Sequence, residues 1–462
     1  MNSLPGRANL FDLTTSRALH IVGAGGSGMG PIATVLHAMG HRVTGSDALE
    51  SPGVERLRQL GVEVHTGLGE YTPPADTEAL AVSTAIPESN AQVQHARNAG
   101  IPVLRRAEVL AAIAVTRRTV AVAGTHGKTT TSTFMALVLE SGGLRPSWII
   151  GGDLVGRGTG AQWDSGPWFV VEADESDGTF IELGAEAVVV TNVEPDHLEH
   201  YGGWEGLVAA FDQFVAAADG PRVVCIDDPG AAGLAARFPV TTYGTDPRAQ
   251  YRIVDLNLGR YETAFGVEHG NEKVAVVLPA PGLHNVRNAT AAIAMGNQLD
   301  VPMSVAAAGL NMYAGIGRRF QRRGERAGVT FVDDYAHLPS EVKAAVSAAL
   351  DGGWDRVVAV FQPHRFSRTQ QVGPDFGQSF DGVDLVILTD IYAAGEPPRP
   401  GVTGQIVCDA VSASPGHPEM VYMPDRRQLP GAVAAILRPG DLCLTLGAGD
   451  ITKLADEILT LL

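Results

Sequence analysis

The chain has 462 residues, of which 45% are hydrophobic and 18% are charged, a composition typical of a folded globular protein rather than of a disordered one. This length is sufficient for about three domains. The formal net charge of -17 disfavours general binding to nucleic acid or to an anionic membrane surface. An anionic ligand must therefore be held by local glycine loops and arginines.

The three cysteines, Cys225, Cys408 and Cys443, are far apart and have no C-x-x-C spacing, which supports neither a disulfide framework nor a zinc site. No apolar run approaches the roughly 18 residues of a membrane-spanning helix. We therefore expect a soluble, cytoplasmic protein without a membrane span and without a nucleic-acid partner.

The first part of the chain begins with a predicted strand at 18–22, a glycine-rich loop, a helix to about Met39 and a second strand at 42–47. Further short strands, such as 80–83, alternate with helical segments up to 107–115. This alternation indicates a parallel sheet.

The loop Gly23-Ala-Gly-Gly-Ser-Gly28 satisfies G-x-G-x-x-G between a strand and a helix, a pattern whose amides bind a diphosphate. Asp47 ends the second strand, where a carboxylate can accept ribose hydroxyls. Taken alone, this unit favours NAD. Because the loop recognises the diphosphate and not the nicotinamide, a UDP-sugar is the open alternative.

A second phosphate-binding loop follows the apolar run Thr119–Ala123 and has the sequence Gly124-Thr-His-Gly-Lys-Thr129. The glycines allow the backbone to wrap an anion, Lys128 can reach terminal phosphates, and Thr129 can ligate Mg²⁺. Val122 stands where the first glycine of the Walker A pattern belongs. Because the loop follows a strand and opens a helix, we predict an ATP site rather than an ordinary strand–turn–helix joint.

Two polar segments follow strands of the same block, at the sheet edge where ligands of open α/β sheets bind. The segment Glu172-Ala-Asp-Glu-Ser-Asp177 follows a strand at 168–171, and Thr191–Leu198 follows a strand at 187–190. Carboxylates and imidazoles that leave room for water and phosphate oxygens suit Mg²⁺.

We therefore predict Glu172 and His197 as magnesium ligands, together with Thr129. Asp174 and Glu175, taken individually, are more typical of a solvated acidic turn.

A third block follows the basic connector 317–324 and contains predicted strands at 329–332, 357–361, 385–388 and 442–446. Helical stretches separate these strands, which again indicates a doubly wound α/β sheet. In an acidic chain the connector favours a domain joint with one arginine directed at ATP phosphate over a nucleic-acid patch.

Two further segments combine polar residues in a suggestive order. His284-Asn-Val-Arg-Asn288 opens a helix at 285–299, where amides commonly serve only as caps. Gln362-Pro-His-Arg-Phe-Ser-Arg368 carries two arginines at the carboxyl end of a strand, a geometry suited to a carboxylate. Surface ion pairing is the alternative for either arginine alone.

Together, and in this order over nearly the whole chain, these motifs resemble the Mur ligase superfamily. The resemblance also rests on Asp333-Asp-Tyr-Ala-His337 and Asp390-Ile-Tyr-Ala-Ala-Gly-Glu396. It implies an α/β fold of three domains: a Rossmann-like N-terminal domain (1–116), a central P-loop ATPase-like parallel sheet (117–317) and a Rossmann-like C-terminal domain (318–462).

The resemblance further implies an ATP-dependent ligase of peptidoglycan precursor synthesis, which joins an amino acid to UDP-N-acetylmuramate through an acyl phosphate. Its ligands are then UDP-N-acetylmuramate, ATP, Mg²⁺ and an amino acid, expected to be L-alanine. NAD is replaced by the UDP-sugar at the first glycine loop.

The resemblance assigns residues to each ligand. For the UDP-sugar they are Gly23, Gly25, Gly26, Ser27, Gly28, Asp47 and Ser83. For ATP they are Gly124, Thr125, His126, Gly127, Lys128, Thr129, Thr130, His284, Asn288, Arg319 and Asp334. For Mg²⁺ they are Thr129, Glu172 and His197, and for the amino acid they are Tyr335, His337, Arg365 and Arg368. The implied catalytic residues are Lys128, His197 and His337.

Two departures from the family pattern affect the third block, since Leu338 and Ser340 stand where a histidine and a threonine are usual. Three alternatives stay open. A member that attaches a whole tripeptide shares most motifs, although the forms of 362–365 and 392–395 favour L-alanine. An NAD-dependent dehydrogenase would leave the loop 124–129 without a role. A non-enzymatic nucleotide switch would leave the two arginines of 362–368 without one.

Overall fold

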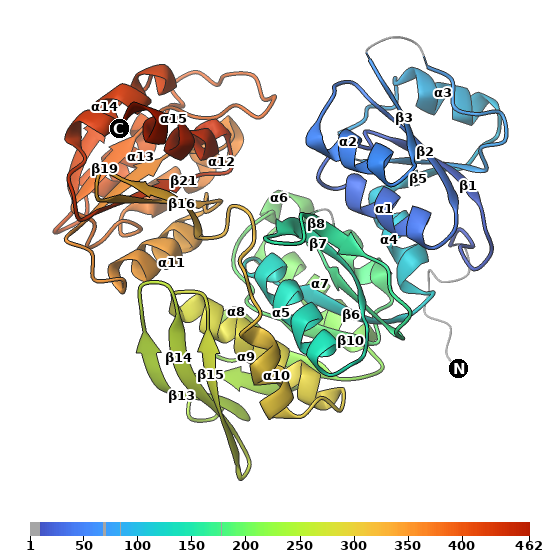
Figure 1. Ribbon diagram of the computed structural model, residues 1–462, viewed down its shortest axis with the longest axis horizontal. Coiled ribbons are helices and arrows are strands. Elements are labelled where there is room, and N and C mark those ends of the chain that lie inside the picture. The colour runs from blue at the N-terminus through green and yellow to red at the C-terminus, as the bar shows by residue number, and fades with distance from the viewer. Residues whose placement is uncertain (1–9, 68–70, 84, 177) are drawn as a thin grey trace. The chain divides into compact units, whose positions relative to one another are not determined.

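The computed structural model describes residues 10–67, 71–83, 85–176 and 178–462. It contains three β-sheets with helices packed on them (Figure 1). Its contacts define two compact units: the first comprises the residues up to 254 with 266–276 and 287–313, and the second comprises 255–265, 277–286 and 314–462. This division leaves the domain limits after residues 116 and 317 as predictions.

The first sheet is parallel, with the strand order β3-β2-β1-β4-β5 of a Rossmann-like fold. Its strands are β1 (Ala18–Val22), β2 (Arg42–Asp47), β3 (Glu63–Thr66), β4 (Ala79–Val82) and β5 (Val103–Arg105). Its helices are α1 (Gly30–Ala38), α2 (Pro52–Gln59), α3 (Ala91–Asn98) and α4 (Arg106–Ala114). Ala79 and Ala81 belong to the core that includes α1 and α4, whereas Leu80 and Val82 pack with Val93 of α3. Helices thus cover both faces, which explains the continuous apolar strands.

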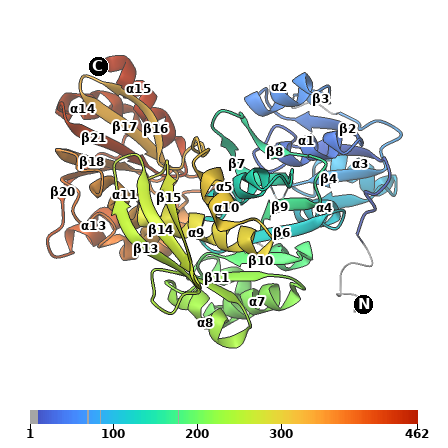
Figure 2. The same ribbon diagram turned by 60° about the horizontal axis from the view of Figure 1, so that its bottom comes forward.

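The second sheet has ten strands in the order β15-β14-β13-β12-β11-β10-β6-β9-β7-β8. The strands are β6 (Arg118–Ala123), β7 (Ser147–Leu154), β8 (Thr159–Gln162), β9 (Trp168–Glu172), β10 (Ala187–Val190), β11 (Arg222–Cys225), β12 (Thr241–Gly244), β13 (Tyr251–Leu258), β14 (Thr263–His269) and β15 (Glu272–Leu278). In this order, each neighbouring pair from β13 through β6 to β7 is parallel. Strand β8, at the end of the sheet, pairs antiparallel with β7. Figure 2 shows β13, β14 and β15 side by side at one end of this sheet.

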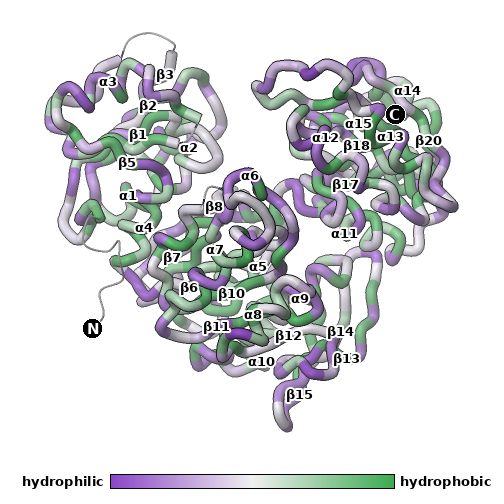
Figure 3. The backbone as a smooth tube through the Cα atoms, turned by 180° about the vertical axis from the view of Figure 1, so that it is seen from behind, coloured by the Kyte–Doolittle hydropathy of each residue, from purple (hydrophilic) through white to green (hydrophobic). Residues whose placement is uncertain are grey.

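The helices of this part are α5 (Lys128–Ser141), α6 (Leu198–Tyr201), α7 (Trp204–Ala217), α8 (Pro229–Arg237), α9 (Leu283–Gln298) and α10 (Met303–Leu310), with the 3₁₀ turn η2 (Thr179–Leu183). The central strands β6 and β10 are almost entirely buried, and Figure 3 shows hydrophobic residues along them. Helix α5 is buried over most of its length. The loop between β6 and α5 is therefore anchored on both sides by core residues.

The third sheet has the order β16-β17-β21-β18-β19-β20 and is parallel except for β16. Its strands are β16 (Gln321–Arg326), β17 (Val329–Asp334), β18 (Arg356–Phe361), β19 (Leu385–Leu388), β20 (Glu419–Tyr422) and β21 (Asp441–Leu446). Its helices are α11 (Pro339–Leu350), α12 (Phe366–Val372), α13 (Gln405–Ser412), α14 (Leu429–Ile436) and α15 (Leu454–Leu461), with the 3₁₀ turns η3 (Gly373–Phe376), η4 (Arg426–Gln428) and η5 (Asp450–Lys453). Along β18, Val357 and Ala359 share a core with α11 and α13, whereas Val358 and Val360 share one with α14 and α15.

The predicted α/β fold class is confirmed, and the strands predicted at 42–47, 187–190 and 385–388 have these limits in the structure. The connector predicted at 317–324 is wrong in its second half, because 321–326 form the edge strand β16. This strand is polar and charged along its length, so it lacks the apolar alternation by which strands are predicted.

The three cysteines are free and buried, in agreement with the expectation of no disulfide framework. Within the described ranges, none of the helices has the length and apolarity needed to cross a membrane.

Candidate active site

The phosphate loop connects β6 to α5 through two glycines in left-handed conformations. Gly124 has φ +136° and Gly127 has φ +80°, values that other residues rarely adopt. A Cβ atom at Gly127 would lie 2.7 Å from Oδ1 of Asn288, which brings this predicted ATP residue against the loop. Among the described residues, no side chain caps the start of α5. Because the first amides of a helix carry partial positive charge, the loop is suited to an anion.

The segment after β10 holds the loop in place. Thr191 Oγ1 donates to the carbonyl oxygen of His126 at 2.6 Å, and the amide of His126 donates to Oδ1 of Asn192 at 2.8 Å. The amide of Glu194 donates to Oγ1 of Thr125 at 2.9 Å. Thr125 and His126, both predicted to bind ATP, thus also anchor the loop to the neighbouring strand.

The ammonium group of Lys128 lies within the loop. Its Nζ donates to the carbonyl oxygen of Gly124 at 2.7 Å and to the two carboxylate oxygens of Glu175 at 3.0 and 2.8 Å. Glu175 is only 2% exposed, so the expectation of a solvated turn is wrong for this residue. Burial alone would lower the Lys128 pKa, but the charges of Glu175 and Asp174 outweigh it, and the pKa is raised. Lys128 therefore stays cationic.

Asp174 is half-buried beside this pair and accepts a hydrogen bond from the amide of Ser176 at 3.1 Å. Burial would raise its pKa, but Lys128, the Ser176 bonds and Arg106 together outweigh it, and the Asp174 pKa is lowered. Asp177, the last residue of the predicted acidic segment, lies outside the described residues.

The three predicted magnesium ligands come from elements beside the phosphate loop. Thr129 is the second residue of α5, Glu172 ends β9, and His197 precedes α6 with φ 54°. Strands β9 and β10 flank β6 in the sheet. Glu172 accepts the amide of Gly151 at 2.5 Å, and His197 Nε2 lies 3.3 Å from Oδ2 of Asp196.

Among the residues that the structure describes, no three His, Cys, Asp or Glu side chains are grouped as a complete metal site. A hydroxyl, one carboxylate and one imidazole nevertheless fit an ion that takes its remaining ligands from phosphate and water, as Mg²⁺ does in nucleotide sites.

The glycine loop of the first sheet is closed by hydrogen bonds to β2. The amide of Gly23 donates to the carbonyl oxygen of Ser46 at 2.8 Å, and the amide of Gly25 donates to Oδ2 of Asp47 at 2.8 Å. The Asp47 carboxylate, predicted to meet the ribose, therefore also orders the loop. The other predicted UDP-sugar residues lie at the same carboxyl edge of the sheet: Gly26, Ser27, Gly28 and Ser83.

Two predicted ATP residues of the third sheet adjoin each other at the end of β17. Asp334 is 8% exposed and accepts the amides of Phe320 at 2.6 Å and Ala336 at 2.7 Å. Burial raises the pKa of Asp334 to about 6, although the charge of Arg319 opposes this shift. The Arg319 guanidinium lies 5.2 Å from the ring centre of Tyr335, a predicted alanine-binding residue.

The other predicted alanine-binding residues surround His364, which is absent from the predicted set. The rings of His337 and His364 are 5.8 Å apart, and Arg368 Nη1 lies 3.3 Å from Nδ1 of His364. Burial, reinforced by nearby positive charges, lowers the pKa of His364 to about 4. Arg365 has φ 67° at the start of α12, and its Nη1 lies 3.9 Å from Oε1 of Glu396. The cluster thus combines cationic and neutral donors.

The predicted ATP residues fall in both compact units. Those of the loop 124–130 and Asn288 belong to the first unit, and His284, Arg319 and Asp334 belong to the second. His284 is the second residue of α9.

Sequence models of three domains match the chain in order: "Mur ligase family, catalytic domain" over 18–118, "Mur ligase middle domain" over 166–296 and "Mur ligase, glutamate ligase domain" over 318–449. The chain belongs to the Mur ligase family. As a member it is an ATP-dependent ligase, which confirms the predicted enzyme class in place of a dehydrogenase or a non-enzymatic switch.

Individual Mur ligases are similar over nearly the full length. The chain is 43% identical over 451 residues to the UDP-N-acetylmuramate–L-alanine ligase of Agrobacterium fabrum, covering 95% of both chains. It is 44% identical over 457 residues to the enzyme of that name from Kineococcus radiotolerans, covering 96% of both. The solved UDP-N-acetylmuramate-alanine ligase of Thermotoga maritima is 26% identical, with a TM-score of 0.79 over 96% of this chain and 98% of that one.

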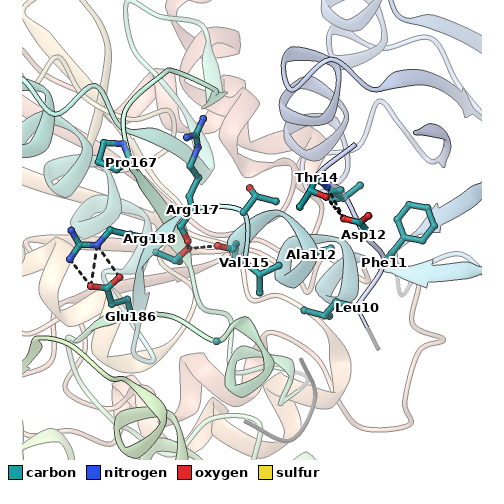
Figure 4. A pocket seen from close by; sticks show the side chains of 15 residues that line it. Leu10, Phe11, Asp12, Thr14, Ala112, Val115, Arg117, Arg118, Pro167 and Glu186 are labelled. Carbon is teal, nitrogen blue, oxygen red and sulfur yellow. Dashed lines mark hydrogen bonds and ion pairs between the residues drawn. The ribbon is translucent and has the colours of Figure 1, made fainter. Parts of the chain in front are cut away.

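This Mur ligase also has a pocket of about 650 Å³ at the opposite end of β6 from the phosphate loop (Figure 4). Leu10, Phe11 and Val115 contribute apolar walls, and Arg118 and Glu186 form an ion pair beside it. None of the predicted site residues is among the described residues that line this pocket. It is therefore separate from the candidate active site.

Proposed function

We propose that the chain joins L-alanine to the lactyl carboxylate of UDP-N-acetylmuramate, with ATP as the energy source, in the synthesis of peptidoglycan precursors. One observation carries this proposal. A half-buried, cationic Lys128 lies within a glycine-containing phosphate loop, in a chain that is 43% identical over 95% of its length to a ligase of that name. The reaction takes place in the cytoplasm, where ATP is available.

The proposed reaction has two chemical steps. A lactyl carboxylate oxygen attacks the γ-phosphorus of ATP, ADP leaves, and an acyl phosphate forms. The amine nitrogen of alanine then attacks the acyl carbon, loses a proton, and inorganic phosphate leaves from the tetrahedral intermediate. No protein nucleophile is needed, so the chain contributes mainly position and charge.

Lys128 supplies positive charge where the phosphoryl oxygens gain negative charge. The amides at the start of α5 hold the terminal phosphates. Thr129, Glu172 and His197 would hold Mg²⁺, which neutralises phosphate charge when it is bound.

The third sheet supports the choice of a small amino acid. Arg365 and Arg368 can present planar, paired donors to the carboxylate of alanine. The ring centres of Tyr335 and His337 are 5.3 Å apart, and His337 reaches Arg368 through the ring of His364. We assign His337 as the group that accepts the proton lost by the alanine amine.

Phosphate release tests the proposal. UDP-N-acetylmuramate and Mg-ATP should give stoichiometric phosphate and ligated product only when L-alanine is added. Lys128→Ala should abolish ligation and leave the affinity for UDP-N-acetylmuramate nearly unchanged, because the two anions are assigned to separate loops. Stimulation by a tripeptide but not by L-alanine would refute the choice of amino acid, and ligation retained by Lys128→Ala would refute the role of the lysine.

A further inference from the structure

Arg106 stands at the carboxyl edge of the first sheet without an assigned role. It is the first residue of α4 and directly follows β5. Because β5 and β1 run in the same direction in one parallel sheet, the end of β5 and the glycine loop after β1 lie at the same edge.

The Arg106 side chain lies against the third glycine of the loop. A Cβ atom at Gly28 would be 3.2 Å from Nε, 3.5 Å from Cδ and 4.0 Å from Cζ of Arg106. A larger side chain at Gly28 would therefore displace the guanidinium. The absence of a side chain at this position allows the arginine to approach the mouth of the loop.

The guanidinium has no protein partner for its buried nitrogen. Arg106 Nε is inaccessible to solvent and forms no hydrogen bond to any described residue. Arg106 forms no ion pair within the ranges that the structure describes, although its charge helps to lower the pKa of Asp174. A buried donor without an acceptor costs free energy, whereas a phosphate oxygen beside Nε would accept its hydrogen bond.

Unpartnered amides lie beside it. The amides of Gly23, Gly25 and Gly26 are already bonded to Ser46, Asp47 and Gly23. In the described part of the chain, the amides of Ser27, Gly28 and Met29 have no hydrogen-bond acceptor, and no side chain caps α1. Consecutive free amides at a helix start form a concave anion site.

We propose that Arg106 binds the diphosphate of the nucleotide sugar, completing the anion site formed by the amides of Ser27, Gly28 and Met29. This inference rests on the proposed function and adds a binding residue to it. A planar guanidinium matches phosphate oxygens with paired hydrogen bonds, which a lysine does not reproduce. The location over the third glycine, where α1 begins, favours the diphosphate over the lactyl carboxylate.

Calorimetric titration with UDP tests the proposal, because UDP has the diphosphate but neither the sugar nor the carboxylate. Arg106→Ala should weaken UDP binding by about tenfold or more, the loss expected for hydrogen bonds to a charged group. Arg106→Lys should recover only part of that loss. The affinity for Mg-ATP should not change, because ATP is assigned to the loop after β6.

Arg105→Ala is the matched control, since it removes the same charge from the adjacent, exposed residue. It should leave UDP binding unchanged. Melting temperatures identify any variant that fails to fold, and in that case Arg106→Lys alone decides through its UDP affinity.

Three outcomes would overturn the inference: UDP affinity unchanged in both Arg106 variants, an equal loss in Arg105→Ala, or a loss confined to UDP-N-acetylmuramate with UDP and UDP-N-acetylglucosamine unaffected. The last outcome would assign Arg106 to the lactyl carboxylate. Failure of the wild-type protein to bind any of the three ligands would instead refute the proposed function, so the two failures are distinguishable.

Discussion

At the scale of single residues, the ion pair of Lys128 and Glu175 is both a stability element and a part of the phosphate loop. The side chains are 16% and 3% exposed, so removal of one partner leaves the other charge buried. Such breaks cost about 3 to 5 kcal/mol. Glu175→Ala should lower the free energy of unfolding by about 3 kcal/mol, as measured by chemical denaturation.

A double-mutant cycle provides the control for this prediction. Lys128→Ala combined with Glu175→Ala should destabilise the protein less than the sum of the two single changes, because neither charge then stays unpaired. Strict additivity would show that the two side chains are not coupled.

The Asp334 carboxyl should contribute to stability at low pH and lose that contribution as pH rises. Its pKa is raised by burial from 3.8 to about 6, so the folded state holds a proton that the unfolded state has lost between these values. This contribution is therefore fully present below about pH 4 and is lost as pH rises through 6, to a total of about 3 kcal/mol. Denaturation of wild type and Asp334→Asn between pH 4 and 7.5 should show that the stability of the wild type relative to the variant falls as pH rises.

His364 acts in the opposite direction, because its lowered pKa of about 4 makes stability fall as pH decreases from 6.5. Since both proteins retain His364, the difference between their stability curves isolates the Asp334 carboxyl. A difference that does not vary with pH would contradict the raised pKa.

Arg365 is predicted to bind the alanine carboxylate. Arg365→Ala should raise the KM for alanine by about 30-fold, equivalent to about 2 kcal/mol, and change the KM for ATP little. Steady-state phosphate release measures both constants. Arg427→Ala, which removes an 88% exposed arginine of the same sheet's helices, should leave both unchanged. An equal increase in both KM values would indicate a general structural defect instead.

At the scale of elements, apolar strands were predictable and polar ones were not. The runs 187–190 and 385–388 consist of aliphatic residues that are buried in the structure. A short, continuous apolar run of this kind is typical of a buried strand in a parallel sheet. Strand β16 exists because it pairs with β17, and its own residues carry no signal of this. Burial contributed by a partner segment is not encoded in a local pattern.

The site shows the same division. Loop residues such as Lys128 and Gly127 follow from a local motif, and the structure places them together. The burial of Glu175 depends on the lysine that it neutralises, 47 residues away. His364 lies within the motif 361–365, but the sequence prediction assigned a role only to its neighbour Arg365. In the structure, the ring contact of His364 with His337 is the centre of that cluster.

Leu338, a departure from the family pattern, belongs to this scale because it directly precedes α11. Its side chain is 6% exposed. Leu338→His should therefore cost about 1 to 3 kcal/mol by burying a polar ring, with little change in selectivity between alanine and glycine. Thermal melting and competition assays measure the two effects. Leu350→His, at the 38% exposed end of the same helix, should be nearly neutral. A large selectivity change at constant melting temperature would place Leu338 in the alanine pocket.

At the scale of the whole molecule, a chain with a net charge of -17 is proposed to bind two anionic ligands, UDP-N-acetylmuramate and ATP. Local structure accounts for this, because the two predicted phosphate sites each combine amides at a helix start with one cationic side chain. Long-range attraction is not required for such sites, and the acidic surface disfavours other polyanions.

The two compact units should melt as separate cooperative elements. Each has its own buried cluster, and proteins of several domains commonly depart from two-state unfolding. Calorimetry should therefore give a van't Hoff enthalpy below the calorimetric one. UDP at about 100 times its Kd should stabilise the unit that contains the glycine loop by about 2.7 kcal/mol.

Of the five tryptophans, only Trp354 belongs to the second unit, so fluorescence melting of Trp354→Phe follows the first unit alone. The fluorescence transition should shift with UDP, while a second calorimetric transition stays in place. A single two-state transition that moves as a whole with UDP would show that the units unfold together.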